Sequence, residues 1–389
     1  MRVERTKAMK LVLIGGGHSH AIALKLWSQH SLPGVELVLI SDVEDTPYSG
    51  MLPGYVAGFY TYQETHINLT NLAAISGAKL ILDKAIALDL ENNQVVCKNH
   101  QPVSFDFLSL DIGSTPRTSE VPGASEFAIP VKPVPSFLKA WDQLLTNFQT
   151  NPQSAPQINI IGGGAGGVEL AFTMYTRLQS LLGKSCQPQI SIIHRNSKLL
   201  AGHNRRVSRL IPKLLNQKGI KIHLNTEVLE IQKDRLLCQS NQSQGNQDQK
   251  NHTIDTDYTF WATQADSPDW IKSSAFALDS QGFILIDDNL QSLSHPQVFA
   301  TGDIATMKNY QRPKAGVFAV RQGNPLYQNW LNVLTNKPCQ PYVPQDKYLA
   351  LIGTGDYRAI ASWGNLCWRS RLLWYLKDYI DRKFMNQFE

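Results

Sequence analysis

The sequence has few of the features of a membrane-spanning, disulfide-bonded or nucleic-acid-binding protein. None of its apolar runs approaches the roughly 18 residues that a membrane-spanning helix needs. Its five cysteines form no disulfide framework, Cys-x-x-Cys pair or zinc spacing, and they suit a reducing compartment. Lys and Arg exceed Asp and Glu only by 37 to 32, too small an excess to indicate a nucleic-acid surface. We therefore expect a globular, cytoplasmic protein that is not an integral membrane protein.

Two segments of the 389-residue chain share one order of elements: strand, glycine turn, helix, strand. The first runs through residues 10–14, 15–17, 19–28 and 35–40, and the second through residues 157–161, 162–164, 166–182 and 189–194. This order predicts parallel βαβ units. The spacing of the two units indicates two dinucleotide-binding domains rather than a short repeat array. The proline-rich stretch 116–135 is interpreted as a linker, Asn92-Asn93 as a hairpin turn, and residues 239–252 as a polar hairpin tip.

The first glycine cluster occupies residues 15–20 and follows a predicted strand directly. Gly15 permits a tight turn, Gly17 lets the backbone approach a pyrophosphate, and the helix start supplies N–H donors. His20 stands where the dinucleotide fingerprint has its third glycine. At the end of the second strand, Ser41 replaces the acidic residue expected to bind a ribose, and Asp42 follows it. Either side chain could make that contact.

The second cluster is a complete fingerprint formed by Gly162, Gly164 and Gly167. Its second strand ends in His194-Arg195 instead of a carboxylate. An arginine in that place favours the 2′-phosphate of NADP, although the pattern fits a plain surface arginine at least as well.

A third motif, Thr301-Gly302-Asp303, follows a short apolar strand. By itself it is an ordinary turn at the end of a strand. Combined with two dinucleotide folds, the Asp303 carboxylate is suited to accept hydrogen bonds from the polyol chain of a flavin, and the helix after it to face the pyrophosphate.

With these motifs the chain resembles flavoproteins with two dinucleotide-binding domains, the superfamily of pyridine nucleotide-disulfide oxidoreductases and type II NADH dehydrogenases. Four segments resemble most closely the flavoprotein module fused ahead of selenophosphate synthetase: residues 15–20, 46–54, 111–116 and 130–133. The resemblance implies an α/β fold with two Rossmann-like domains and a C-terminal α+β segment. It places the FAD domain in residues 9–120 and 264–335, the NAD(P)H domain in 121–263 and the C-terminal segment in 336–389.

The resemblance also implies FAD and either NADH or NADPH as cofactors, and it assigns roles to individual residues. Glu169 matches a glutamate near the nicotinamide, and Gln322 matches a glutamine near a quinone pocket. Lys132 is either a flavin or substrate contact or a linker lysine. The candidate cofactor-binding residues are Gly15, Gly17, His18, Ser41, Asp42, Pro47, Tyr48, Gly113, Gly162, Gly164, Gly167, Arg195, Gly302, Asp303 and Val317.

Cysteine is missing where related enzymes carry redox thiols. Residues 46–58, where disulfide reductases have a Cys-x4-Cys pair, contain none. Residues 162–171, around the second glycine motif, also contain none, in contrast to sulfide:quinone reductases. Electrons must therefore pass from the reduced flavin directly to an acceptor.

The C-terminal segment bears on that acceptor. We predict short strands after Pro325 and then a helix from about residue 365 to the end. This helix has basic residues beside one apolar face formed by Trp368, Leu372, Leu373, Leu376, Tyr379, Ile380 and Phe384. Such a helix favours a membrane surface, with packing on the protein's own core or in a homodimer interface as the alternative. Residues 1–10 and 357–389 each carry a net charge of +3, so the rest of the chain is nearly neutral.

The sequence therefore predicts an FAD-dependent NAD(P)H oxidoreductase that passes electrons to a quinone at a membrane surface. It would be cytoplasmic, and peripheral on the cytoplasmic membrane face if the C-terminal helix binds lipid. The alternative is a flavin-binding redox module linked to selenium metabolism, motivated by His18 and His20 and by the resemblance to the fused module.

Overall fold

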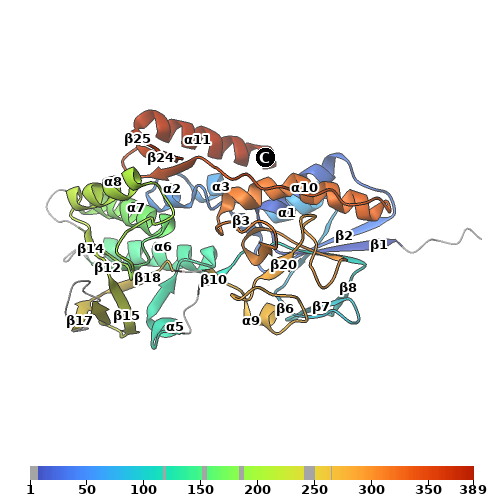
Figure 1. Cartoon of the computed structure of the whole chain (residues 1–389), viewed down its shortest axis with the longest axis horizontal. Helices are drawn as coiled ribbons and strands as arrows, with labels where there is room; N and C mark the ends of the chain where they lie inside the picture. Colours follow the sequence, from blue (N-terminus) through green and yellow to red (C-terminus); the bar gives the residue numbers. More distant parts are fainter. Residues whose placement is uncertain (1–7, 117–119, 151–155, 184–187, 241–249, 264) are drawn as a thin grey trace, which may run out of the picture.

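A computed structural model describes residues 8–116, 120–150, 156–183, 188–240, 250–263 and 265–389 (Figure 1). The basic residues of the first seven positions, Cys186 and most of the predicted polar tip lie outside these ranges.

The first glycine cluster lies in a five-stranded parallel sheet with the order β21-β9-β1-β2-β5. Its strands are β1 (Met9–Ile14), β2 (Val35–Ser41), β5 (Lys79–Leu82), β9 (Phe107–Leu110) and β21 (Val298–Ala300). The helices of this region are α1 (His18–Gln29), α2 (Leu52–Val56), α3 (Tyr62–Thr65), α4 (Leu69–Ser76), α9 (Asp269–Lys272) and α10 (Gly316–Leu334). Its smaller strands are β3 (Asp45–Pro47), β4 (His66–Asn68), β6 (Ala85–Asp89), β7 (Gln94–Cys97), β8 (Val103–Ser104), β20 (Ile284–Ile286) and β22 (Ala305–Met307).

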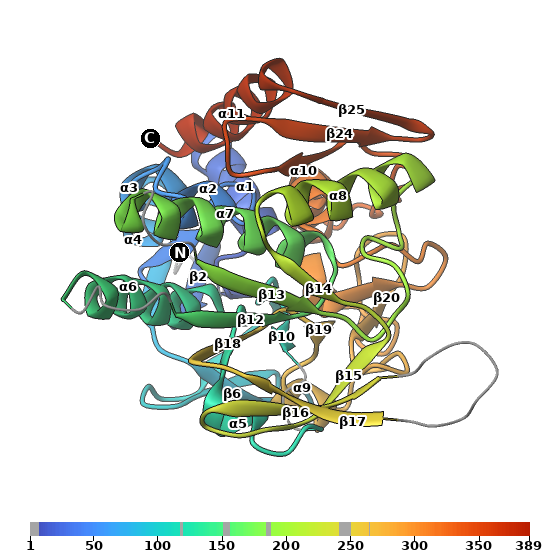
Figure 2. The same ribbon diagram turned by 90° about the vertical axis from the view of Figure 1, so that its left-hand side faces the viewer.

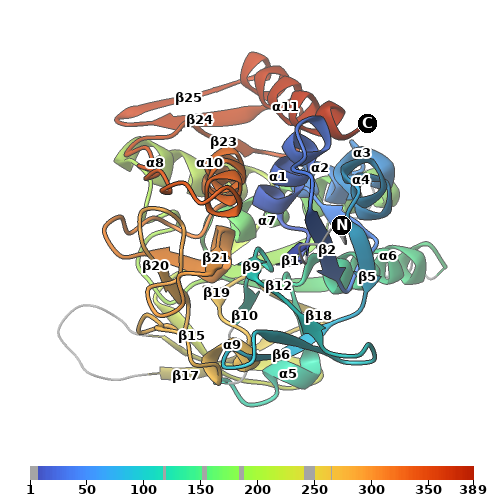
Figure 3. The same ribbon diagram turned by 90° about the vertical axis from the view of Figure 1, so that its right-hand side faces the viewer.

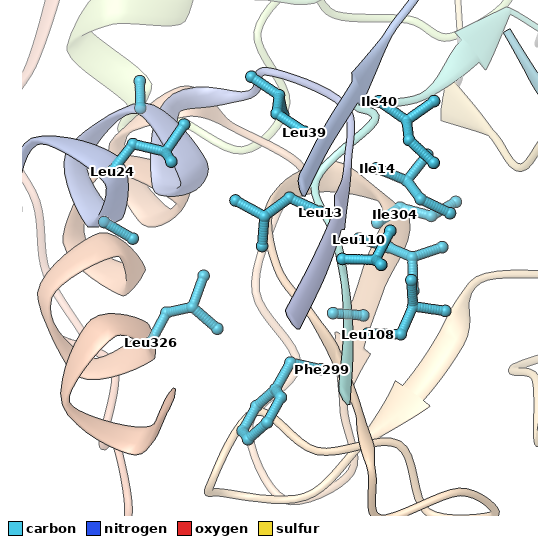
Figure 4. Packing of buried hydrophobic residues seen from close by; sticks show 14 of the residues in the cluster. Leu13, Ile14, Leu24, Leu39, Ile40, Leu108, Leu110, Phe299, Ile304 and Leu326 are labelled. Carbon is cyan, nitrogen blue, oxygen red and sulfur yellow. The ribbon is translucent and has the colours of Figure 1, made fainter. Parts of the chain in front are cut away.

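This sheet is the centre of the larger hydrophobic core. Leu13 and Leu39 from adjacent strands are fully buried, and Leu24 of α1 and Leu326 of α10 lie on the side of the sheet that these two helices cover (Figure 4). Continuous burial along β1 and β2, rather than alternation, is expected for a parallel sheet with both faces covered.

The second glycine cluster lies in another parallel sheet with the order β11-β18-β12-β13-β14. Its strands are β11 (Ala128–Pro130), β12 (Gln157–Ile161), β13 (Gln189–Ile193), β14 (Lys221–His223) and β18 (Tyr258–Trp261). The accompanying elements are α5 (Ala124–Phe127), α6 (Val134–Thr150), α7 (Ala165–Leu182), α8 (Arg205–Gln217) and the antiparallel strands β15 (Thr226–Ile231), β16 (Arg235–Ser240) and β17 (Lys250–Asp255). The predicted α/β fold with two Rossmann-like units is confirmed.

Two short strands join the two sheet regions. β10 (Thr115–Pro116) leaves the first region and β19 (Ala265–Asp266) returns to it, and the two pair antiparallel. The connection out of the first region and the connection back into it therefore run side by side.

Short strands lie ahead of the C-terminal helix as predicted, but they begin only after α10, which continues past Pro325 to Leu334, and the helix begins later than residue 365. Antiparallel strands β23 (Ala350–Gly353), β24 (Ala359–Trp363) and β25 (Leu366–Ser370) precede α11 (Arg371–Met385). The turn between β24 and β25 is Gly364-Asn365, and Gly364 adopts a φ of +53°, as a two-residue hairpin turn requires. The helix begins only after Ser370, whose hydroxyl accepts a hydrogen bond from the Leu373 N–H. Figures 2 and 3 show this hairpin and α11 together on one side of the molecule.

Candidate functional site

The first glycine turn has the geometry that a dinucleotide needs. Gly15 has a φ of +87°, and a Cβ there would lie 2.5 Å from the carbonyl oxygen of Asp111. Gly17 precedes α1 in an extended conformation, and no side chain caps the helix from this position. The N-terminus of α1 therefore lies directly after a turn that only glycine can form.

His20 fills the place of the third glycine as a structural residue. Its Nδ1 lies 2.6 Å from the carbonyl oxygen of Gly15, and its Nε2 lies 2.8 Å from the Ser109 hydroxyl. Burial lowers the pKa of His20 to about 4, so the ring is neutral at physiological pH. His18 starts the helix, and its Nε2 lies 3.2 Å from the Ser49 hydroxyl. Burial lowers the pKa of His18 to about 4 as well.

Asp111, which follows β9, is a site residue that the sequence motifs did not predict. One oxygen of its carboxylate accepts hydrogen bonds from the N–H groups of Ser19 (2.8 Å) and His20 (3.1 Å), in the first turn of α1. Burial raises the pKa of Asp111 to about 7, the N–H donors oppose this shift, and Asp303 adds to it. The signal that could have identified Asp111 was a carboxylate at the carboxyl end of a buried strand, beside the strand that leads into the glycine turn.

Asp303 and Lys132 form an ion pair between the two sheet regions. Nζ of Lys132, which follows β11, lies 2.5 Å from Oδ2 of Asp303 and 3.1 Å from the Ser114 hydroxyl. Burial favours a higher pKa for Asp303, but Lys132 and Lys314 outweigh it and hold that pKa below the ordinary value. Lys132 therefore contacts the Asp303 turn directly.

Gln322 of α10 lies beneath the same turn. Its Oε1 accepts a hydrogen bond of 2.8 Å from the N–H of Gly302, so the buried amide fixes the backbone that presents Asp303. Gln322, Asp303 and Lys314 line one pocket. Its wall also includes Ala315 and Phe318, at the start of α10.

The other candidates for the first site lie at different depths in the first sheet region. The Ser41 hydroxyl donates to the carbonyl of Val43, whereas Asp42 is exposed. Gly113 has a φ of +71° with open space around its Cβ position. Val317 lies half-buried in the first turn of α10, and Pro47 ends β3.

The second glycine turn assigns a separate task to each glycine. Gly162 has a φ of +127°, and its Cβ would lie 2.5 Å from the carbonyl oxygen of Ala262. A Cβ on Gly167 would lie 2.0 Å from the carbonyl oxygen of Gly162, so this glycine lets α7 approach the strand. Around Gly164 nothing lies within 4 Å of the Cβ position, which leaves the helix start open to a ligand. This division matches the three tasks of the dinucleotide fingerprint.

Arg195 and Glu169 flank this second turn. Arg195 is exposed, one residue after His194, whose Nδ1 accepts a hydrogen bond from the Gly163 N–H. Glu169 of α7 accepts a hydrogen bond of 2.8 Å from the N–H of Gly353 in β23. Burial raises the pKa of Glu169 despite the opposing charge of Lys377.

Tyr48 connects the first site to α11. Its hydroxyl donates to Oδ1 of Asp381 (3.2 Å), and its ring lies 4.3 Å from the Phe384 ring and 5.2 Å from the His18 ring, measured between centroids. Lys377 Nζ donates to the other Asp381 oxygen and to the carbonyl of Gly50, both at 2.6 Å. The inner side of α11 therefore rests on the loop after β3.

The four described cysteines are free thiols, two of them buried: Cys97, Cys238, Cys339 and Cys367. Burial raises the pKa of Cys238 to about 11, which makes it a poor nucleophile.

Two glycine turns that each open a helix, with a carboxylate turn after β21, define a protein with two dinucleotide-binding units. Residues 9–323 match the pyridine nucleotide-disulphide oxidoreductase family, and the chain belongs to that family. It is an FAD-dependent NAD(P)H oxidoreductase. The open helix start at Gly164 and the carboxylate turn beside the Gly15 turn fit the two cofactors. FAD supplies the electron transfer between nicotinamide and acceptor when bound, and the protein supplies binding and orientation.

The similarity to known proteins covers most of the chain. Ferroptosis suppressor protein 1 of Taeniopygia guttata is 25% identical over 91% of this chain and 89% of its own length. Demethylphylloquinone reductase NdbB of Synechocystis is also 25% identical, over 88% of this chain and 84% of its own. The structure of NDH2 from Plasmodium falciparum in complex with NADH has the same fold, with a TM-score of 0.81, 15% identity and 97% coverage of both chains.

Proposed function

We propose that this oxidoreductase reduces a quinone at a membrane surface, to which it binds through α11 and the β24–β25 hairpin. The observation that carries the proposal is the orientation of α11, whose apolar side faces away from the rest of the protein. The name of the Synechocystis relative, a demethylphylloquinone reductase, supports a quinone as acceptor.

The outward side of α11 is a continuous apolar stripe at helical spacing. Its most exposed members are Leu372, with 71% of its surface accessible, and Tyr379, with 63%. The stripe consists of Leu372, Tyr375, Leu376, Tyr379 and Ile380, and the hairpin adds Trp363, Leu366 and Trp368. We call these eight residues the apolar face. Leu373 is half-buried and Phe384 is buried, so these two do not belong to it, contrary to the sequence prediction.

The inner side of α11 carries charge. Lys377 and Asp381 pair with each other, Asp378 accepts a hydrogen bond from the Tyr60 hydroxyl, and Arg382 pairs with Glu64. A helix packed on its own protein normally has the opposite arrangement. Because the fold does not use the apolar face, a lipid surface is the environment that would stabilise it.

The composition of this surface favours lipid over a second copy of the chain. Trp and Tyr prefer the region of the headgroups, and both residue types are present in the apolar face. Arg371 and Lys383 lie near the two ends of α11, where anionic headgroups would attract them. Among the helices of the described residues, none is both long and apolar enough to cross a bilayer.

The membrane side and the flavin side meet at the aromatic rings beneath α11. Phe384 stacks on Tyr48, and Tyr48 lies next to His18 at the start of α1. A quinone ring that leaves the bilayer along α11 would meet these rings first. Glu169, which lies within reach of the Lys377 charge, would hold a proton close to the acceptor. Lys132 and Gln322 would position the Asp303 turn.

The proposal is tested by an anaerobic titration of the purified protein. NADH or NADPH should bleach the bound flavin, and a soluble quinone should restore its colour. A protein without flavin, or a flavin that neither nucleotide bleaches, would refute the oxidoreductase. If the nucleotide reduces the flavin but the quinone does not reoxidise it, quinone as the electron acceptor would be refuted. A loss of the NADPH rate in R195A, with the NADH rate unchanged, would identify NADPH as the donor that Arg195 selects.

Membrane binding is tested by sedimentation with vesicles that contain anionic lipid. Burying one leucine side chain contributes about 1.5–3 kcal/mol, so the double change L372S/L376S should weaken binding about 100-fold or more. V343S removes an equally exposed apolar side chain outside the apolar face and should leave binding unchanged. If the wild-type protein remains in the supernatant, membrane binding is refuted. If it elutes as a dimer that L372S/L376S dissociates, the apolar face is a dimer interface instead.

The selenium-linked alternative rests on the resemblance of residues 15–20 and 111–116 to the module fused to selenophosphate synthetase. His20 does not add to it, because both ring nitrogens already have partners within the fold. An oxidised flavin that selenide reduces, with no turnover of quinone, would favour this alternative.

A further inference from the structure

The Asp111 carboxylate occupies the end of α1 that an anionic ligand would use. Oδ2 accepts the N–H groups of Ser19 and His20, and the carbonyl oxygen of Asp111 accepts the N–H of Gly17 at 3.0 Å. The unpaired N–H groups at a helix start, together with the helix dipole, attract negative charge. In this protein, Asp111 supplies that charge from within.

Two glycines from distant parts of the chain make room for the carboxylate. A Cβ on Gly17 would lie 2.3 Å from Cγ of Asp111, and a Cβ on Gly302 would lie 2.5 Å from Oδ1. Both glycines also belong to the motifs that predict FAD. The carboxylate therefore lies between the two backbone segments that a bound FAD has to approach.

The charges around Asp111 do not neutralise it. From η1 (Gly302–Ile304), Asp303 faces it with a like charge, and from α1 the nearby rings of His18 and His20 are neutral above about pH 5 because burial lowers each pKa to about 4. Lys132 and Lys314 act on Asp303. Within the described residues, no cation forms an ion pair with Asp111, which is 3% exposed.

We propose that FAD binds this protein with the Asp111 carboxyl protonated, so that binding takes up one proton. The proposal rests on FAD as the cofactor of the first glycine turn. A pyrophosphate at the start of α1 would place its negative charge against the ionised carboxylate, whereas a neutral carboxyl can remain in place and donate a hydrogen bond. Burial already raises the pKa of Asp111 to about 7 without any ligand, so its protonation near neutral pH is within reach.

FAD affinity should depend on pH in one direction only. Below about pH 7 the Asp111 carboxyl is already protonated, so FAD affinity should not change with pH. Above it, the dissociation constant of FAD should rise by up to tenfold per pH unit, because each bound FAD requires one proton.

The test follows FAD release from the diluted holoprotein by flavin fluorescence between pH 6 and 9. In the wild-type protein the dissociation constant of FAD should rise with pH, whereas in D111N it should hardly change with pH. At pH 8, D111N should bind FAD about tenfold more tightly than the wild type. K314M is the matched control, because burial lowers the pKa of Lys314 to about 8 and this lysine titrates in the same range. The slope due to Asp111 should persist in K314M.

A second readout uses the unaltered protein and stays informative if D111N does not fold. Releasing FAD at pH 8 in a weakly buffered indicator solution should release close to one proton per flavin. Equal slopes in wild type and D111N, or no proton release from wild type, would overturn the proposal. A protein that holds no FAD at any pH would instead refute the cofactor assignment on which it rests.

Discussion

The pairing of Lys377 with Asp381 should decide whether α11 stays on the protein. The side chains are 16% and 6% exposed, and Lys377 also holds the carbonyl of Gly50. In K377M, the Asp381 carboxylate would keep the Tyr48 hydroxyl as a partner but lose its counter-charge. Leaving one charge of a buried pair without its partner costs about 3–5 kcal/mol. Because Lys377 is not fully buried, we take the lower end, about 3 kcal/mol.

This loss should appear as easier local opening of α11 rather than as global unfolding. Since about 1.4 kcal/mol corresponds to a factor of ten, the amides of α11 should exchange hydrogen about 100-fold faster in K377M than in wild type. Hydrogen exchange followed by mass spectrometry of a peptide covering residues 371–385 measures this directly.

Two further variants make the experiment decisive. K383M removes a lysine of the same helix that forms no ion pair within the described residues, and it should change the exchange of α11 little. The double variant K377M/D381L replaces the pair by apolar side chains and should recover most of the protection, since it leaves no unpaired charge. If K377M exchanged like K383M, or if K377M/D381L exchanged as fast as K377M, the pair would not hold the helix in place.

Two further predictions concern the cofactor turns. G167A places a Cβ 2.0 Å from the carbonyl oxygen of Gly162 and should destabilise the protein by about 1–3 kcal/mol, seen as a lower melting temperature, whereas G164A should leave the melting temperature unchanged and raise the KM for NAD(P)H about tenfold. Removing the Lys132 charge in K132M should raise the depressed pKa of Asp303. The stability that ionised Asp303 contributes is lost as pH falls through its folded-state pKa, so acid unfolding followed by circular dichroism should begin at a higher pH in K132M than in wild type.

The fold could be predicted closely wherever local pattern and tertiary environment agree. The strand 157–161 is confirmed residue for residue as β12, and the helices at 19–28 and 166–182 differ from α1 and α7 by one residue at most at each end. An apolar strand followed directly by a glycine turn is compatible with few other arrangements of secondary structure. The start of the C-terminal helix was predicted too early, because Trp368 also fits the helical spacing of the residues after it. The Gly364-Asn365 turn was the signal that a hairpin precedes the helix.

The site was predictable at the glycines and not at the buried polar contacts. Glycine positions follow from local backbone geometry, so Gly162, Gly164 and Gly167 fit their tasks without knowledge of the rest of the fold. Asp111 touches α1 across 92 residues of sequence, and no local pattern reveals such a contact. The Lys132–Asp303 pair, 171 residues apart, is hidden for the same reason.

The pairing of β10 with β19 brings Pro116 and Ala265 together, although 148 residues of sequence lie between them. Thr115 faces Asp266 across this ladder, so the intervening chain leaves the first sheet region and returns to it at two neighbouring strands. A segment whose ends meet can be exchanged as a cassette without lengthening or cutting the host sheet. Grafting a homologous segment between these two strands would therefore test whether the intervening chain sets the nucleotide preference, provided that the graft carries a lysine to meet Asp303.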